Sequence, residues 1–170
     1  PAQYRSRLEA LTAAMPQARI VARPPGKMRD VMKQVFREAR QDPETPVLQF
    51  RHDDDDAVAV NFVERFRDAA GDCSGLIAKS PTVGIDFNRG FSARPTADGM
   101  RATPSFMPYY VVALGMAVAP YQDQTIMNFG HNKINQVMPT VTFSDEDMFV
   151  RGHNDFNDSR QKSNVKRVNL

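Results

Sequence analysis

Apolar and polar positions along the first third of the chain follow the periods of regular secondary structure. Apolar residues recur at helical spacing over 2–14 and again over 27–40, which predicts two amphipathic helices. Short apolar runs at 18–22 and 47–51 predict strands on either side of the second helix. Strand, helix and strand in close succession predict a βαβ unit, with a parallel strand pair and a right-handed crossover.

Beyond residue 56 the pattern continues to mix helices and strands. The expected elements are a helix at 57–69, strands at 76–78 and 83–87, a loop at 92–105, a buried segment at 109–119 that is either strand or helix, a short helix at 128–137 and a last strand at 148–151. We therefore expect a single α/β domain over residues 1–161, with an open, mainly parallel sheet flanked by helices. Residues 162–170 form a polar tail.

Four consecutive carboxylates, Asp53 to Asp56, lie between the expected strand at 47–51 and the expected helix at 57–69. Open α/β sheets bind ligands at this end of their strands. Neighbouring carboxylates repel by roughly 1–3 kcal/mol per pair, whereas a helix amino terminus returns only about 0.3–1 kcal/mol per charge. A hard divalent cation bound through oxygen would remove this imbalance. The alternative is a solvated turn in which one acid caps the helix.

The residues leave the geometry of such a cation site open. An extended chain would project Asp53 and Asp55 to the same side. An early helix start would instead bring Asp53 and Asp56 together. Either arrangement delivers two carboxylates to one cation.

A second polar group occupies 151–160, after the last expected strand, and it combines His, Asn, Asp, Ser and Arg. Arg151 and Arg160 are candidates to bind phosphate oxygens, and His153 is a candidate nitrogen ligand. A polar loop without a site is the alternative. For His131 we expect a structural role rather than metal ligation.

Composition narrows the function classes. Apolar content of 41% and charged content of 25% are ordinary for a globular protein. Residues 1–40 carry nine Lys and Arg against three Asp and Glu, and residues 41–72 carry three against nine. This distribution suits a metal site that holds an anionic substrate and argues against whole-protein nucleic-acid binding. Cys73 is the only cysteine, and neither a membrane span nor a signal peptide is evident, so we expect a cytoplasmic location.

Several of these segments together resemble the bacterial family called putative rhamnosyltransferases. The matching segments are Arg51 to Ala57, Asn88 to Phe91, Asn128 to Lys133, Arg151 to Asn154, and Asn157 to Arg160. They occur in the expected order and span most of the chain.

This resemblance implies a GT-A-like glycosyltransferase fold and a site that uses Mn²⁺ or Mg²⁺. The acids of a D-x-D motif would hold the metal against the diphosphate of a nucleotide-sugar donor, a role that falls on Asp53, Asp55 and Asp56. The expected assignments in the carboxyl-terminal segment are His153 as a further metal ligand, Arg151, Asn154, Ser159 and Arg160 at the donor diphosphate, and Asp158 as the base that deprotonates the acceptor.

The expected partners are a nucleotide-sugar donor and a glycan or lipid-linked acceptor, and peripheral membrane association is left open. The first strand-helix-strand of the nucleotide-binding half has no counterpart here. We therefore expect a chain that is the later part of the fold or has an incomplete donor pocket. Two other functions compete: a haloacid dehalogenase-like, Mg²⁺-dependent phosphohydrolase, and a non-catalytic module that binds divalent cations.

Overall fold

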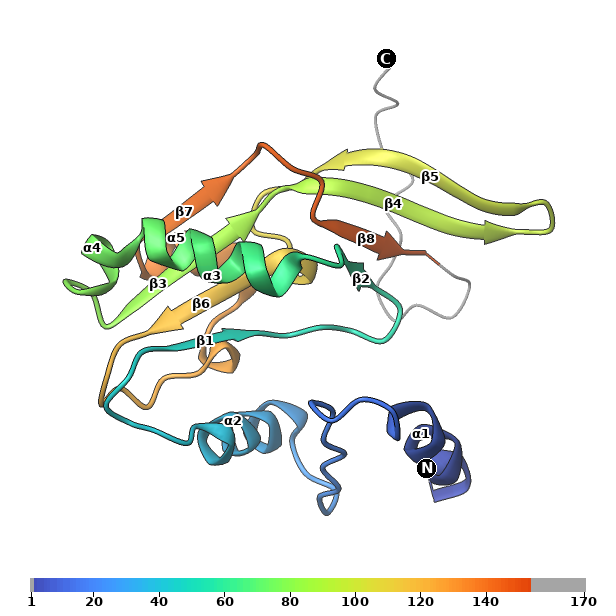
Figure 1. Cartoon of the computed structure of the whole chain (residues 1–170), viewed down its shortest axis with the longest axis horizontal. Coiled ribbons are helices and arrows are strands. Elements are labelled where there is room, and N and C mark those ends of the chain that lie inside the picture. The colour runs from blue at the N-terminus through green and yellow to red at the C-terminus, as the bar shows by residue number, and fades with distance from the viewer. Residues whose placement is uncertain (1, 154–170) are drawn as a thin grey trace.

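The computed structural model describes residues 2–153, which form a mixed α/β structure with two four-stranded sheets (Figure 1). The α-helices are α1 (Arg5–Thr12), α2 (Met28–Ala39), α3 (Phe62–Asp72), α4 (Ser74–Ile77) and α5 (Ile134–Val137). The strands are β1 (Val47–Phe50), β2 (Ala57–Val58), β3 (Thr82–Phe87), β4 (Arg89–Thr96), β5 (Gly99–Phe106), β6 (Leu114–Val118), β7 (Thr140–Phe143) and β8 (Phe149–Gly152). Short 3₁₀ helices are η1 (Ala2–Tyr4), η2 (Val111–Ala113), η3 (Ile126–Asn128) and η4 (His131–Lys133).

The first sheet has the strand order β1-β6-β3-β7. β6 is antiparallel to both β1 and β3, and β3 is parallel to β7. Helix α3 covers one face, where Phe62 and Phe66 pack among Ile85 and Phe87 in a buried aromatic cluster. Gly115 of β6 lies directly under this helix, because a Cβ there would be 2.1 Å from Cζ of Phe66.

Helix α2 packs on the opposite face of this sheet. Its Met32 and Phe36 pack against the buried side chains of Met116, Val118 and Met127. The guanidinium groups on α2 and just after it donate hydrogen bonds to backbone carbonyls of residues 119–127. The sheet is therefore a central layer between helices.

The second sheet has the order β2-β8-β4-β5, and β8 is parallel to β4 but antiparallel to β2. Strands β4 and β5 form a long hairpin that projects from the body of the molecule (Figure 1). Its turn reaches Gly99, whose φ of +119° is readily adopted only by glycine. Because β2 follows the acidic run and β8 precedes residue 153, this sheet joins the two segments singled out in the sequence.

The expectation of a mainly parallel sheet is wrong, since among the strands of residues 2–153 only the pairs β3/β7 and β4/β8 are parallel. The expected strand at 18–22 is not formed, and Ile20 and Val21 are each 37% exposed. The predicted βαβ unit is therefore absent from the described part of the chain. The neighbour that β1 has in the sheet is the antiparallel β6, which lies much later in the sequence.

Other local expectations need correction in the same way. Residues 57–58 form a strand with β8, and the helix expected from 57 begins only at Phe62. Residues 76–78, expected as a strand, lie largely in the helical turn α4. The expected loop at 92–105 is the β4–β5 hairpin. The segment 109–119 contains η2 and then β6, and the helix expected at 128–137 is divided into η4 and α5.

Candidate functional site

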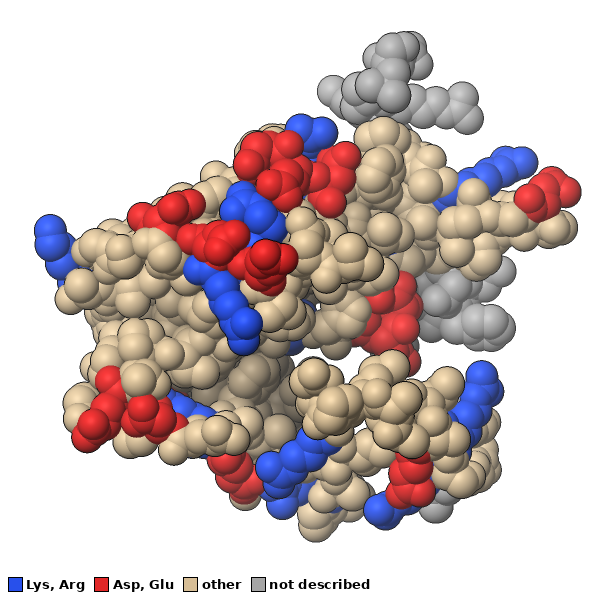
Figure 2. All heavy atoms as spheres, in the orientation of Figure 1, with Lys and Arg blue, Asp and Glu red and all other residues tan. Residues whose placement is uncertain are grey.

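The acidic run forms a tight turn at the carboxyl end of β1, where it crosses from the first sheet to the second. The backbone N–H of Asp56 donates to the carbonyl of Asp53 at 3.2 Å, and Asp54 and Asp55 occupy the centre of the turn. In Figure 2 acidic side chains gather at the place where Figure 1 draws this β1–β2 connection. The four carboxylates therefore lie together, although neither an extended strand nor an early helix start brings them there.

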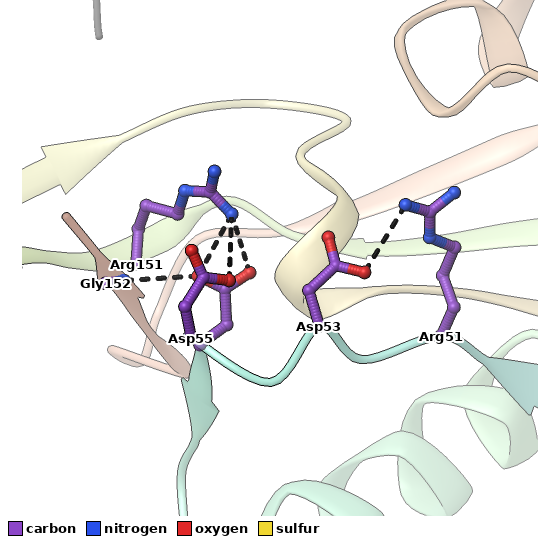
Figure 3. A network of polar contacts seen from close by, with 6 residues as sticks. Arg51, Asp53, Asp55, Arg151 and Gly152 are labelled. Atoms are coloured by element: carbon purple, nitrogen blue, oxygen red, sulfur yellow. Dashed lines mark hydrogen bonds and ion pairs between the residues drawn. The ribbon is translucent and has the colours of Figure 1, made fainter. Parts of the chain in front are cut away.

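The last carboxylate of the run is fixed by the carboxyl-terminal strand. Both oxygens of Asp56 accept hydrogen bonds from Nη1 of Arg151, at 2.9 and 3.1 Å, and Oδ1 also accepts from the backbone N–H of Gly152 at 3.1 Å. The side chain of Asp56 has no exposed surface and that of Arg151 is 10% exposed. Burial raises the pKa of the Asp56 carboxyl, and the positive charge of Arg151 opposes this rise. We call this buried pair the Asp56–Arg151 clamp (Figure 3).

Gly152 lets the two segments approach each other. A Cβ at this position would lie 1.7 Å from the backbone carbonyl oxygen of Asp55, so no other residue fits without moving the acidic turn. Its N–H also donates to the clamp, as described above. The glycine therefore sets the distance between β8 and the turn.

Tyr110 packs against the clamp, and a buried acid binds the backbone of the residue before it. The ring of Tyr110 lies 5.6 Å from Cζ of Arg151 in a cation–π contact. The preceding Tyr109 has φ of +58°, and its N–H donates to Oδ1 of Asp86 at 3.0 Å. Oδ2 of Asp86 accepts from the Thr142 hydroxyl at 3.1 Å, and burial raises the pKa of Asp86 to about 6.

Asp53 and Asp55 are candidate carboxylates for a ligand, because both keep exposed side-chain surface. Their side chains are 41% and 21% exposed, and Figure 3 shows both rising from the same side of the turn. Asp53 receives a long contact of 3.5 Å from Arg51, and Asp55 lies 3.9 Å from Arg151. Carboxylate oxygens are the ligands that Mg²⁺ and Mn²⁺ favour, so the pair fits the predicted cation.

The described residues do not complete a metal site by themselves. Between residues 2 and 153, no group of three or more His, Cys, Asp and Glu side chains is placed to hold a metal ion. Asp56, predicted as a ligand, is already engaged by Arg151. A cation at Asp53 and Asp55 therefore needs further ligands beyond these two carboxylates.

Basic groups lie on the Asp53 side of the turn. His131 is partly buried, and it is close enough to Arg51, Asp53 and Arg29 for their charges to act on it. Burial, and next the positive charge of Arg51, lower the pKa of His131, which favours the neutral imidazole. Reasoning from the sequence could not place Arg29 and Arg51 near this histidine, because they come from α2 and from the end of β1.

A cavity of about 300 Å³ opens on the other side of the turn. Asp54, Asp55 and His153 line it together with residues of the β4–β5 hairpin, among them Pro95 and Met100. Within the described residues, the structure thus brings the predicted ligand His153 to the same cavity as Asp54, Asp55 and Asp56. A larger cavity of about 850 Å³ lies at the opposite end of β1, and none of the residues that line it is an acid.

Four predicted site residues lie outside the residues that the structure describes. These are Asn154, Asp158, Ser159 and Arg160. Arg151 was predicted to bind phosphate, and the structure places its guanidinium on Asp56. Its predicted role at the donor therefore stays a prediction.

Comparisons with known proteins give the family. A family model described as "Putative rhamnosyl transferase" matches residues 1–166. The chain belongs to this family. It is thus a member of a glycosyltransferase family, with a sugar donor and an acceptor, which confirms the resemblance drawn from the motifs. The comparisons with curated proteins and with solved structures found no match. Across residues 2–153, no helix has both the length and the apolar character needed to cross a membrane.

Proposed function

We propose that this glycosyltransferase is metal-dependent and moves a sugar from a nucleotide-diphosphate donor to a glycan or lipid-linked acceptor. The observation that carries the proposal is the acidic turn, in which Asp53 and Asp55 face the solvent while Asp56 is held by Arg151. Repulsion between the carboxylates of Asp53 and Asp55 makes this turn a favourable place for a divalent cation.

The charge on the Asp53 side suits the donor diphosphate. Arg51 and Arg29 bring positive charge toward His131, and the neutral imidazole can donate one hydrogen bond. A divalent cation held by Asp53 and Asp55 would neutralise the charge that develops on the departing diphosphate. We propose that Arg51 also binds the donor diphosphate, because the contact that Arg51 makes with Asp53 is long and partly exposed.

Transfer requires that the acceptor hydroxyl oxygen bonds to the anomeric carbon while the bond from that carbon to the diphosphate breaks. The diphosphate leaves with the electron pair, and the hydroxyl proton passes to a carboxylate. For this proton the sequence predicts Asp158, which lies outside the described residues. His153 stays a predicted further ligand, and Asn154, Ser159 and Arg160 stay predicted donor-binding residues.

The strand order supports a GT-A-like fold as the proposed architecture, with mixed rather than mainly parallel strands. β1 ends at the acids, and its neighbour β6 is antiparallel inside the sheet. The same arrangement weighs against the phosphohydrolase alternative, which places its D-x-D after a strand of a parallel sheet. A non-catalytic module that binds cations is the remaining alternative, and the test below separates it from the lead function.

Titration calorimetry tests the metal role. We expect uridine, thymidine or guanosine diphosphate to bind in the presence of Mn²⁺ and to bind at least about tenfold more weakly when Asp55→Asn removes one charged ligand, a loss of ~1.4 kcal/mol. Asp98→Asn, at the exposed tip of the β4–β5 hairpin, is the matched control and should bind like the wild type. Equal affinity in both variants would contradict the proposal. Cation binding without any nucleotide binding would favour the non-catalytic alternative.

A further inference from the structure

The acidic turn separates two surfaces of opposite character. On the Asp53 side lie Arg29, Arg51 and His131, which suit an anion. On the other side, the cavity of about 300 Å³ is lined by Asp54, Asp55 and His153. Apart from the clamped Asp56, no other charged side chain of residues 2–153 lines this cavity.

The wall of the cavity opposite the acids is apolar and comes from the second sheet. Ala93, Pro95 and Met100 of the β4–β5 hairpin line it, together with Val150 of β8. Met100 is 66% exposed, although it lies in a regular strand. An exposed methionine beside proline at a cavity mouth offers apolar surface to a ligand rather than to the core.

From this pairing of an acidic and an apolar wall we infer that the cavity is a saccharide site and that the β4–β5 hairpin is its binding arm. Carboxylates accept hydrogen bonds from sugar hydroxyls, and the apolar side chains cover the C–H faces of the ring. The volume lies at the small end of ligand pockets, which suits a short saccharide. Negative charge on this side disfavours nucleotides, phosphorylated sugars and phospholipid head groups.

The inference extends the proposed function and rests on it, because it assigns the acceptor to the second sheet and the donor to the Asp53 side. The acceptor hydroxyl would then reach the turn from the side of the hairpin, opposite to the diphosphate.

Two substitutions of exposed residues test the site without disturbing the core. Met100→Ser removes the apolar contact, and Ala57→Phe fills the cavity from β2, where residue 57 is exposed. Phe106→Ser is the matched control, because Phe106 lies on the same strand, is 65% exposed, and is not among the residues that line the cavity. Thermal unfolding of the full chain checks that each variant is folded.

The measurement is ligand-observed NMR with neutral methyl glycosides of rhamnose, glucose and galactose as probes. We expect the wild type and Phe106→Ser to bind at least one probe. Met100→Ser should weaken that binding at least about fivefold, the factor that ~1 kcal/mol of lost contact gives, and Ala57→Phe should abolish it. No binding of any probe to the wild type, or equal losses in Met100→Ser and Phe106→Ser, would overturn the inference.

Mn²⁺-dependent binding of uridine diphosphate, measured on the same variants, separates this inference from the proposed function. Met100→Ser and Ala57→Phe should leave nucleotide affinity unchanged, whereas Arg51→Ala should weaken it and leave saccharide binding unchanged. If the saccharide site behaves as expected but Arg51→Ala has no effect on the nucleotide, the donor assignment fails and the saccharide site stands. If Met100→Ser weakens both ligands equally, the two-sided arrangement is wrong.

Discussion

Removing the positive charge of the Asp56–Arg151 clamp should have a large effect on stability. In Arg151→Met the aliphatic stem still packs, but the carboxylate of Asp56 loses both of its side-chain hydrogen bonds. The backbone N–H of Gly152 still donates to the Asp56 side chain, which has no exposed surface. Breaking a buried pair in this way costs about 3–5 kcal/mol, a substantial share of the roughly 5–15 kcal/mol by which a domain is stable.

The pH dependence gives this prediction a second signature. Arg151 is the charge that holds the pKa of Asp56 down against burial. Without it the folded-state pKa rises further above the unfolded value. The stability that Arg151→Met has lost should therefore return as the pH falls and Asp56 takes up a proton. Comparing the variant with the wild type at each pH cancels the contribution of other groups such as Asp86.

Urea unfolding of the single variants and of Arg151→Met/Asp56→Asn measures the coupling. The double variant should lose about 0.5–3 kcal/mol less than the sum of the single losses, because it contains no unpaired charge. Arg89→Met is the matched control. Its ion pair with Asp147 spans 3.2 Å, but both side chains are more than 40% exposed, so its loss should cost at most about 1 kcal/mol. If Arg151→Met costs no more than Arg89→Met, the clamp does not hold the turn.

Two further variants test the surroundings of the clamp. The stability of the wild type should fall as the pH rises from about 4 through the folded-state pKa of Asp86, which is about 6. Asp86→Asn should remove this pH dependence, so the variant should be more stable than the wild type at pH 7.5 by up to ~3 kcal/mol. Equal pH profiles of the two proteins in urea unfolding would refute this. Gly152→Ala should destabilise the fold by about 1–3 kcal/mol and weaken Mn²⁺-dependent diphosphate binding, because the new Cβ collides with the carbonyl of Asp55. Gly71→Ala, with nothing within 4 Å of its Cβ, should instead stabilise helix α3 by up to ~1 kcal/mol; calorimetric melting of both glycine variants measures the contrast.

The sequence predicted elements well where the apolar pattern of a segment matches the burial of its side chains in the fold. Helix α2 and strands β1, β3 and β8 lie within one or two residues of their expected bounds. In α2 the apolar positions include Met32 and Phe36, which pack on the sheet. Periodicity reports this kind of burial directly.

Prediction failed where pairing with a distant strand decides the structure. Ala57 and Val58 have the pattern of a helix start, but they pair with β8 and form a strand. The hairpin at 89–106 was missed because Pro95 and Pro104 indicate a loop, although both lie in its paired strands. Conversely, the apolar residues at 18–22 find no strand partner among the described residues, so they do not form a strand.

The residues of the candidate site could be predicted from the sequence, but their contacts with distant segments could not. Four adjacent acids are visible in any reading of the sequence, and His153 stands out in a polar segment. The sequence does not show which acid of the run is buried and hydrogen-bonded, because this depends on Arg151 and Gly152 reaching Asp56 from β8. Likewise, only the fold brings Arg29 toward His131.

The central claim is that Asp53 and Asp55 hold the cation and diphosphate of a sugar donor. A crystal structure of the chain with Mn²⁺ and uridine diphosphate tests it most directly, because manganese can be located by its anomalous scattering. We predict a manganese peak within about 2.5 Å of a carboxylate oxygen of Asp53 or Asp55, with diphosphate oxygens completing the shell and Arg51 beside them. A metal bound elsewhere, or a diphosphate bound away from the acidic turn, would contradict the account.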